Sequence, residues 1–308
     1  KYRKTLVVND VLRIGGENVA PGETKKIELE MPPLYTATNM SIPVYVKRGK
    51  RPGPIMFVSA AIHGDELNGI SFAGVGSATT VDYIQVHQNL DDGIEFFGGT
   101  VSVKHVVLTA NGDDSFDWSF GWIGNAQYVL IKQSDAEGDN AFESDNSEFD
   151  AAATPLTNPT VANVTILGAD GANGVRLRAG TAGALHNFVI TGPAGYANCL
   201  RVNGDESRAN VDNGSLIMTN SVVACDAASN FEDDFAETWF TAETTNSVLA
   251  AGDLGLAANG YMPTASSPLL GAGVDPSTVD SFFDSVDYIG AMDESNDWTA
   301  GWVTIGLE

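Results

Sequence analysis

The chain has 308 residues, of which 43% are hydrophobic and 18% are charged, so it is long and apolar enough to bury a sizeable core. Sixteen Lys and Arg stand against 40 Asp and Glu, and the net charge of −24 disfavours nucleic acid as a partner. No apolar run approaches the roughly 18 residues of a membrane span. Two cysteines are too few for a disulfide scaffold, and 33 glycines favour many short strands.

The first 70 residues differ in charge from the rest of the chain. They hold ten Lys and Arg against seven Asp and Glu, whereas the remainder holds six against 33. Three strands bounded by Gly or Pro are predicted here, at 24–31, 40–48 and 55–62. The third leads into His63-Gly64-Asp65-Glu66. A His and a Glu three residues apart, directly after a buried strand, are plausible zinc ligands.

Two motifs in this region, GKRPGP and AAIHGDELNGI, carry a family resemblance. Residues 14–70 resemble the N-terminus of the succinylglutamate desuccinylase/aspartoacylase family of zinc hydrolases. The resemblance implies that His63 and Glu66 are two of three zinc ligands in an enzyme that cleaves N-acyl amino acids. The family's third ligand, its general-base Glu and the helix after the motif have no counterpart here, so the catalytic apparatus looks incomplete.

Five segments after residue 80 repeat one pattern of two short strands with apolar residues two apart. They are 81–99, 103–121, 126–144, 162–180 and 185–203. From Ile84 to the equivalent Val106 is 22 residues, and the next steps are 23, 35 and 24, the long step containing an insertion near 146–158. A period of this length without a helical stripe predicts a β-solenoid, with one coil for each repeat.

The repeat extends backward, because Asn68-Gly69-Ile70 aligns with Asp92-Gly93-Ile94, 24 residues later. The pentapeptide ELNGI (66–70) therefore belongs to both patterns, which indicates a fusion at that point. Residues 68–308 resemble secreted bacterial right-handed parallel β-helix proteins in GISFAGVGSATTVDYIQVHQNLDDGIEFFGG, SSPLLGAG (266–273), YIGA (288–291) and DWTAGW (297–302).

We therefore predict an all-β fold, a right-handed parallel β-helix whose head is capped by a short N-terminal β segment. The expected boundaries are 1–54 for the cap, 55–290 for the β-helix and 291–308 for a C-terminal tail. Residues 55–62 are expected to pair with 79–86 as an extra first coil, because an uncovered β-helix end exposes strand edges.

A polar residue precedes the second strand of each coil and predicts a ladder of stacked side chains at the turn. Its members are Asn68, Asp92, Asp114, Asn140, Asn173 and Asn198. Outward positions of the second strand place Glu95, Asp117 and Glu143 in one column, followed by Arg176 and Arg201 as counter-charges. The three carboxylates are a candidate calcium site. A retaining glycosidase pair and a merely solvated acidic face remain open for them.

Outward positions of the first strand place Tyr83, His105 and Tyr128 in an aromatic column, a candidate platform for a glycan. The neighbouring column is mostly apolar and needs cover from the 146–158 insertion or from another chain; it comprises Gln85, Val107, Leu130, Thr165 and Val189. Cys199 and Cys225 lie about one coil apart, and the sequence leaves open whether they are bonded.

Taken together, these patterns favour a secreted or cell-surface β-helix scaffold or binding protein that is not an enzyme and holds calcium or a glycan. No signal-peptide pattern opens the chain. The expected partners are a glycan or another cell-surface protein. Two alternatives remain, a zinc-dependent hydrolase of the desuccinylase/aspartoacylase type and a polysaccharide lyase or glycosidase, because one fold hosts many functions.

Overall fold

The computed structural model describes residues 12–14, 17–20, 22–30, 41–47, 69–135, 138–226, 228–303 and 305–307. The chain divides into two compact units, Lys1–Ile55 and Met56–Glu308. In the first unit, two antiparallel pairs form: β1 (Leu12–Ile14) with β2 (Glu17–Val19), and β3 (Thr24–Glu30) with β4 (Ser41–Lys47). The last two match the strands predicted at 24–31 and 40–48. The strand predicted at 55–62, with its pairing to 79–86, lies outside the described residues, and the cap stays a prediction.

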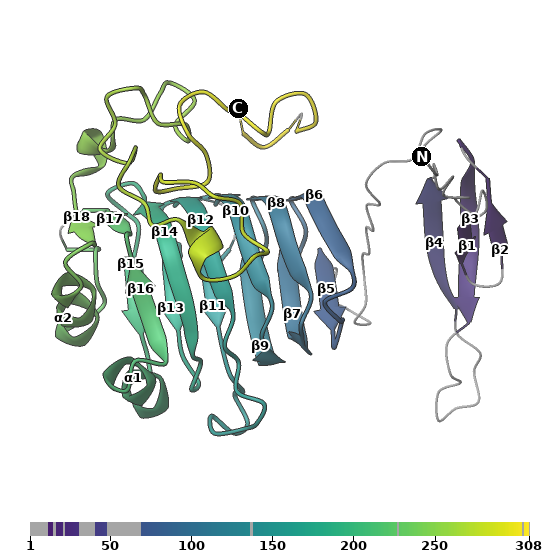
Figure 1. Cartoon of the computed structure of the whole chain (residues 1–308), viewed down its shortest axis with the longest axis horizontal. Coiled ribbons are helices and arrows are strands. Elements are labelled where there is room, and N and C mark those ends of the chain that lie inside the picture. The colour runs from purple at the N-terminus through teal and green to yellow at the C-terminus, as the bar shows by residue number, and fades with distance from the viewer. Residues whose placement is uncertain are drawn as a thin grey trace, which may run out of the picture. The chain divides into compact units, whose positions relative to one another are not determined.

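The second unit is a parallel β-helix built from two sheets, whose strands alternate along the chain from β5 to β15 (Figure 1). The short-strand sheet contains β5 (Ile70–Ala73), β7 (Ile94–Gly99), β9 (Phe116–Trp122), β11 (Asn140–Ser144), β13 (Asn173–Leu177) and β15 (Asn198–Val202). The long-strand sheet contains β6 (Thr80–His87), β8 (Ser102–Thr109), β10 (Asn125–Lys132), β12 (Thr160–Leu167), β14 (Gly183–Thr191), β16 (Leu216–Thr219), β17 (Val222–Ala224) and β18 (Ser247–Val248). The predicted parallel β-helix is therefore confirmed.

Equivalent residues of successive coils pair in the register that the repeats predict. In the long-strand sheet the paired column runs through Ile84, Val106, Val129, Val164 and Phe188. The 35-residue step does not break this column, because the insertion near 146–158 loops out between β11 and β12. Buried Asn146 closes the loop by donating to the carbonyls of Ala151 and Ala153 and accepting from the amide of Thr157.

Strands β6, β8, β10, β12 and β14 each bend at one residue with left-handed backbone angles, and the same geometry recurs at the junction of β16 and β17, with φ between 48° and 63°. These residues, here called the kink column, are Tyr83, His105, Tyr128, Asn163, Asn187 and Asn220. The ladder pairing skips the kink position, for example between Asp82↔Lys104 and Ile84↔Val106. The bend turns the long strand around the core, so that it covers two sides of each coil.

The core is a stack of inward side chains that repeats from coil to coil. Ring centroids are 5.2 Å apart between Phe72 and Phe96, 5.2 Å between Phe96 and Phe116, and 4.8 Å between Phe116 and Phe142. Such offset stacks of buried rings add dispersion to a large burial of apolar area. They hold the outward side chains of the same strands at a fixed one-coil spacing.

The end of the β-helix beyond β15 is closed by two helices and a disulfide. Helix α1 (Asp205–Asp212) follows β15, and α2 (Asp234–Ala242) buries Ala236 and Phe240 in the core cluster. Cys199 and Cys225 form a disulfide, with their Cα atoms 6.4 Å apart. The pairing that the sequence left open is therefore settled in favour of a bond.

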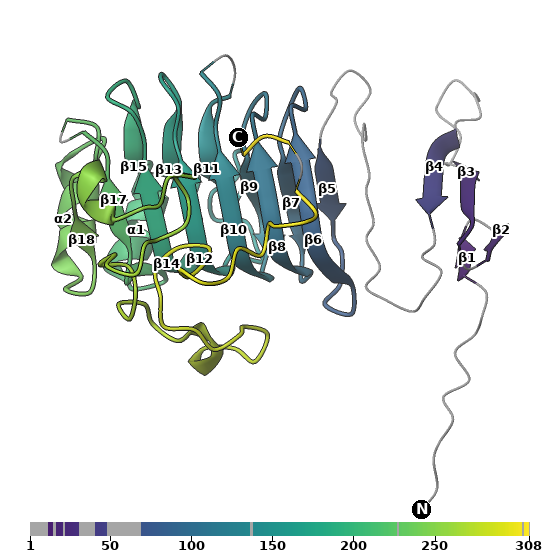
Figure 2. The same cartoon turned by 90° about the horizontal axis from the view of Figure 1, so that it is seen from above.

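The described residues after Val248 form no further strand and contain two short 3-10 helices, η1 (Ala251–Leu254) and η2 (Pro276–Thr278). This C-terminal segment, 249–307, runs back across the outer face of the long-strand sheet from β17 toward β6 (Figures 1 and 2). It buries Val107, Leu130 and Val189. The cover that we expected from the insertion or another chain is thus supplied by the chain's own C-terminal segment.

Candidate functional site

The outer face of the short-strand sheet carries a column of polar side chains, because alternate residues of these strands point away from the core. Paired coil by coil, this outer column is Ser71, Glu95, Asp117, Glu143, Arg176 and Arg201. Its first half is acidic and its second half basic. The sheet positions these groups rigidly, since each sits between inward residues of the stacked core.

Three carboxylates gather at the acidic half, from Asp92, Glu95 and Asp117, whose oxygens lie within 4.8 Å of one another. We call this group the acidic cluster. Asp92 and Glu95 are only 8% and 7% exposed, and Oδ1 of Asp117 is buried with no hydrogen-bond partner. An orphaned carboxylate oxygen is costly in a buried position, and it points to a missing counter-charge or proton.

The cluster differs from the predicted calcium trio in one member. Glu143 lies in register with Asp117, but its carboxylate pairs with Arg176 at 3.0 Å and with Arg178 at 3.1 Å. Asp92, which the sequence placed in the turn ladder, takes its place. The reason is that Asp92 ends the turn directly before β7 and therefore lies beside the strand that carries Glu95.

Burial and repulsion by neighbouring carboxylates raise the pKa values of two members of the cluster, Asp92 and Asp117. Desolvation, Asp114 and Glu95 raise the pKa of Asp92 to about 9. Desolvation, Asp92 and Glu95 raise the pKa of Asp117 well above its ordinary value. Without a cation, Asp92 therefore holds a proton at neutral pH. The carboxyl groups of the cluster can then act in two ways, as oxygen ligands for a hard divalent cation or as proton donors.

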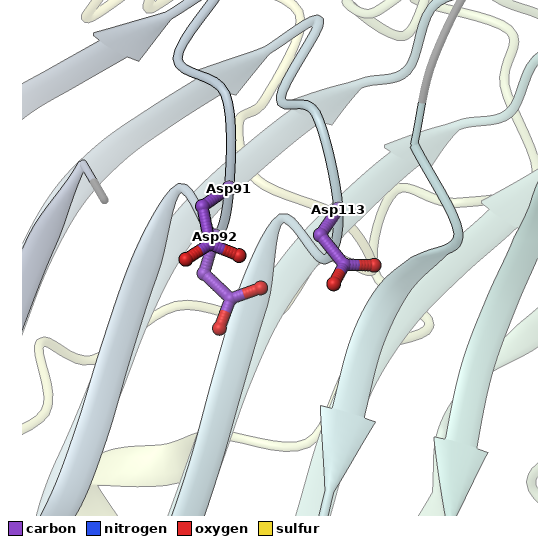
Figure 3. A group of neighbouring side chains, drawn as sticks. All are labelled: Asp91, Asp92 and Asp113. Atoms are coloured by element: carbon purple, nitrogen blue, oxygen red, sulfur yellow. The ribbon is translucent and has the colours of Figure 1, made fainter. Parts of the chain in front are cut away.

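The turns beside the cluster extend the acidic surface. Asp91, Asp92 and Asp113 meet at two neighbouring turns (Figure 3), and Asp113, Asp114 and Asp139 meet one coil further on. Each set has carboxylate oxygens within 4.8 Å of one another. The pKa of Asp113 is raised by burial and by its acidic neighbours. The acidic cluster is therefore one end of a continuous carboxylate row.

Hydrogen bonds join the predicted turn ladder in the described coils. The amide of Asp114 donates to Oδ1 of Asp92 at 3.0 Å, and both the amide and Nδ2 of Asn140 donate to Oδ1 of Asp114 at 2.7 Å. Asn140 is in register with Asn173, and Asn173 with Asn198. Asn68 lies outside the described residues. The ladder fixes Asp92 and thereby one wall of the acidic cluster.

Comparison with known families assigns the fold. Residues 57–263, more than half of the chain, match the family described as the pectate-lyase like beta helix domain. The chain belongs to this family. No curated protein and no solved structure matches the chain significantly. Among the described residues of this pectate-lyase-like β-helix, no helix is long and apolar enough to cross a membrane.

His63 and Glu66, which the resemblance predicts as zinc ligands, lie outside the described residues and within the range that the β-helix family matches. The resemblance of residues 14–70 to the zinc hydrolases and the fusion at 66–70 stay predictions.

The aromatic column of the pectate-lyase-like β-helix is assembled but covered. His105 stacks on Tyr83 at 4.3 Å and on Tyr128 at 4.8 Å between ring centroids. Trp298 and Trp302 of the C-terminal segment pack edge-on against His105 and Tyr83. Tyr128 is 6% exposed and Tyr83 38%. The chain's own tryptophans thus cover part of this column and leave Tyr83 partly exposed, and the glycan platform stays a prediction.

A second aromatic row, which sequence reasoning missed, lies beside the acidic cluster. Phe97 follows Glu95 by two residues and stacks on Phe120 at 6.0 Å, and Phe120 stacks on Phe149 of the insertion at 6.3 Å. Phe120 is 46% and Phe149 87% exposed. The register slips by one residue at the end of β7, where Gly99 pairs with Trp122. This bulge breaks the two-residue alternation, so that the sequence pattern alone does not align these rings.

Proposed function

We propose that this protein is a secreted or cell-surface β-helix binding protein, not an enzyme, that holds a calcium ion in the acidic cluster. The single observation that carries the proposal is the meeting of three carboxylates, from Asp92, Glu95 and Asp117, with one buried oxygen left without a partner. Among the described residues no basic side chain forms an ion pair with Asp92 or Asp117, and a bound divalent cation would supply that counter-charge.

Calcium suits this donor set better than other common metals. All side-chain donors in the cluster are carboxylate oxygens, and calcium takes six to eight oxygen ligands in flexible geometry. Zinc and copper favour nitrogen or sulfur ligands, and the cluster contains neither. Magnesium usually keeps several waters, which the burial of Asp92 and Glu95 opposes.

Two features support an extracellular location. The disulfide between Cys199 and Cys225 is of the kind that persists in oxidising compartments. The net charge of −24 suits a soluble surface protein exposed to millimolar calcium.

A glycan is the ligand that we propose for the same face. The exposed ring of Phe120 belongs to β9, the strand that also carries Asp117 of the acidic cluster, and the exposed ring of Phe149 from the insertion stacks on it. Aromatic faces and carboxylates together can bind the apolar and hydroxyl faces of sugars. A polysaccharide-degrading enzyme is the second candidate, and one observation favours it: a carboxyl group with a strongly raised pKa stands beside other carboxylates, as glycoside hydrolysis requires.

Isothermal titration of calcium into the metal-free protein tests the proposal. We expect the tightest calcium site in the wild type to disappear in Asp117→Asn and to remain in Asp170→Asn, which removes an exposed turn carboxylate outside the cluster. Equal calcium binding in the wild type and Asp117→Asn would contradict the site. Release of reducing or unsaturated ends from a panel of neutral and acidic glycans, lost in Asp117→Asn, would instead favour the enzymatic candidate.

A further inference from the structure

The basic end of the outer column contains an arginine without a counter-charge. Arg176 and Arg201 are paired in register on β13 and β15, so two guanidinium groups lie on neighbouring coils. Arg176 is neutralised by Glu143 at 3.0 Å. Arg201 has no carboxylate within ion-pair distance among the described residues, and its buried Nε has no hydrogen-bond partner.

Other cations of the β-helix unit are paired, which makes this arrangement unusual for so acidic a chain. Lys104 contacts Asp284 at 2.7 Å, Arg178 contacts Asp145 at 2.8 Å, and Arg208 contacts Asp233 at 2.5 Å. The sequence holds 40 Asp and Glu against 16 Lys and Arg, so carboxylates are abundant enough to pair with every cation. The lack of one at Arg201 therefore needs an explanation.

Arg201 is held in place by a neutral group that does not compensate its positive charge, whereas Arg176 is paired with Glu143. Nη2 of Arg201 donates to Oδ1 of Asn140, a fully buried and neutral side chain fixed by Asp114. Nε of Arg176 donates to Oδ1 of Asn203 at 3.3 Å. Burial and the charge of Arg176 lower the pKa of Arg201. The side chains are thus preorganised beside each other despite their repulsion.

We infer that Arg201 and Arg176 form a binding site for one oxyanion group, a carboxylate or a sulfate ester carried by a larger ligand. The planar guanidinium fork matches the geometry of both groups and forms short, charge-assisted hydrogen bonds with them. Asp139 and Glu232 act on Arg201 electrostatically from beyond ion-pair distance. This acidic rim disfavours multiply charged groups such as diphosphates and selects a ligand of low local charge.

The site is separate from the acidic cluster. Asp117 and Arg201 are three coils apart in the outer column, about 14 Å at the usual strand spacing. The inference therefore does not depend on calcium, and its test uses protein freed of divalent cations. A negative result in the calcium titration would therefore not contradict the oxyanion site, and a negative result with the anions would not contradict the calcium site.

The first experiment follows the arginine Nε–Hε signals of the full chain by NMR. Because Nε of Arg201 is buried, its proton exchanges slowly with water and is observable. Sodium sulfate and sodium acetate are titrated separately, with sodium chloride holding the ionic strength constant. We expect a saturable shift of the Arg201 signal, which is identified by its loss in Arg201→Lys, and the same shift in Arg208→Lys. A larger response to sulfate or to acetate identifies the preferred group.

The second experiment measures thermal unfolding. At an anion concentration of tenfold Kd we expect a rise of about 2–3 °C in the wild type beyond that of Arg201→Gln, which corrects for the general stabilising effect of sulfate. The absence of a saturable Arg201 shift with both anions, or an equal rise in Arg201→Gln, overturns the inference.

Discussion

Replacement of Asp92 by Asn tests the electrostatic origin of the acidic cluster. The pKa of Asp92 is raised from 3.8 to about 9 by burial and by Asp114 and Glu95, so the folded protein binds a proton that the unfolded chain releases. Stability from this group is fully present below pH 3.8 and is lost as the pH rises toward 9. At pH 7 the loss is at most about 4 kcal/mol, from 1.36 kcal/mol for each pH unit above 3.8.

Asn keeps the acceptor for the amide of Asp114 and carries no charge to desolvate. In chelator at pH 7 we therefore expect Asp92→Asn to raise the free energy of unfolding by about 2–4 kcal/mol, and the gain to vanish near pH 4. With calcium at a hundredfold Kd, the wild type gains about 2.7 kcal/mol, and the variant, having lost a ligand, gains much less. Calcium thus reduces the difference in the free energy of unfolding between the wild type and Asp92→Asn.

Urea unfolding of both proteins between pH 4 and 9, with chelator and with calcium, measures these changes. Asp170→Asn serves as the matched control, because Asp170 is an exposed turn residue, and its change is expected to stay within about 0.5 kcal/mol. A variant that is less stable than the wild type in chelator at pH 7 would refute the reasoning. So would a gain that does not change with pH.

Two further predictions concern the C-terminal segment and the disulfide. Asn187→Ala should destabilise the protein by about 2–4 kcal/mol, because Asn187 both donates to the carbonyl and accepts from the amide of Val274 and has φ 60°. Asn187→Gly also loses both hydrogen bonds but removes the backbone strain, so its free energy of unfolding in urea should be higher than that of Asn187→Ala. Equal free energies of unfolding for the two variants would show that backbone strain contributes nothing. Reduction of Cys199–Cys225, which closes a loop over a separation of 26 residues, should cost about 2–4 kcal/mol in the same assay. Titration of two thiols in the denatured, unreduced protein would show that the bond is absent.

The register of the β-helix could be predicted because inward residues obey a two-residue alternation that survives insertions. Val129 and Val164 remain partners across 35 residues, since each coil buries its apolar residues against the previous coil whatever the length of the loop between them. The same alternation located the outer column. The sequence pattern predicts these positions correctly because each coil packs against equivalent residues of the coils before and after it.

The site could be predicted only in part, because side-chain contacts reach beyond the offsets of the repeat. Glu143 occupies the expected column, yet Arg178, which lies two residues beyond its register partner Arg176, also neutralises it. Asp92 enters the cluster from the turn, where the repeat assigns it to another column. The repeat specifies backbone positions, whereas charge pairing depends on the reach and direction of each side chain.

The kink column is a part of the repeating long-strand sheet that the non-repeating C-terminal segment contacts. Left-handed backbone angles cost roughly 1–2 kcal/mol for most residues, and Asn tolerates them best. Asn163 and Asn187 combine that tolerance with hydrogen bonds to the backbone of the C-terminal segment, through Tyr288 and Val274. Tyr83 and His105 lack this advantage, but they pack beneath Trp302 and Trp298, so buried aromatic area offsets their strain. The residue type at the kink position therefore differs between coils. It is Asn where the backbone of the C-terminal segment lies over it, and aromatic where the tryptophans of that segment pack on it.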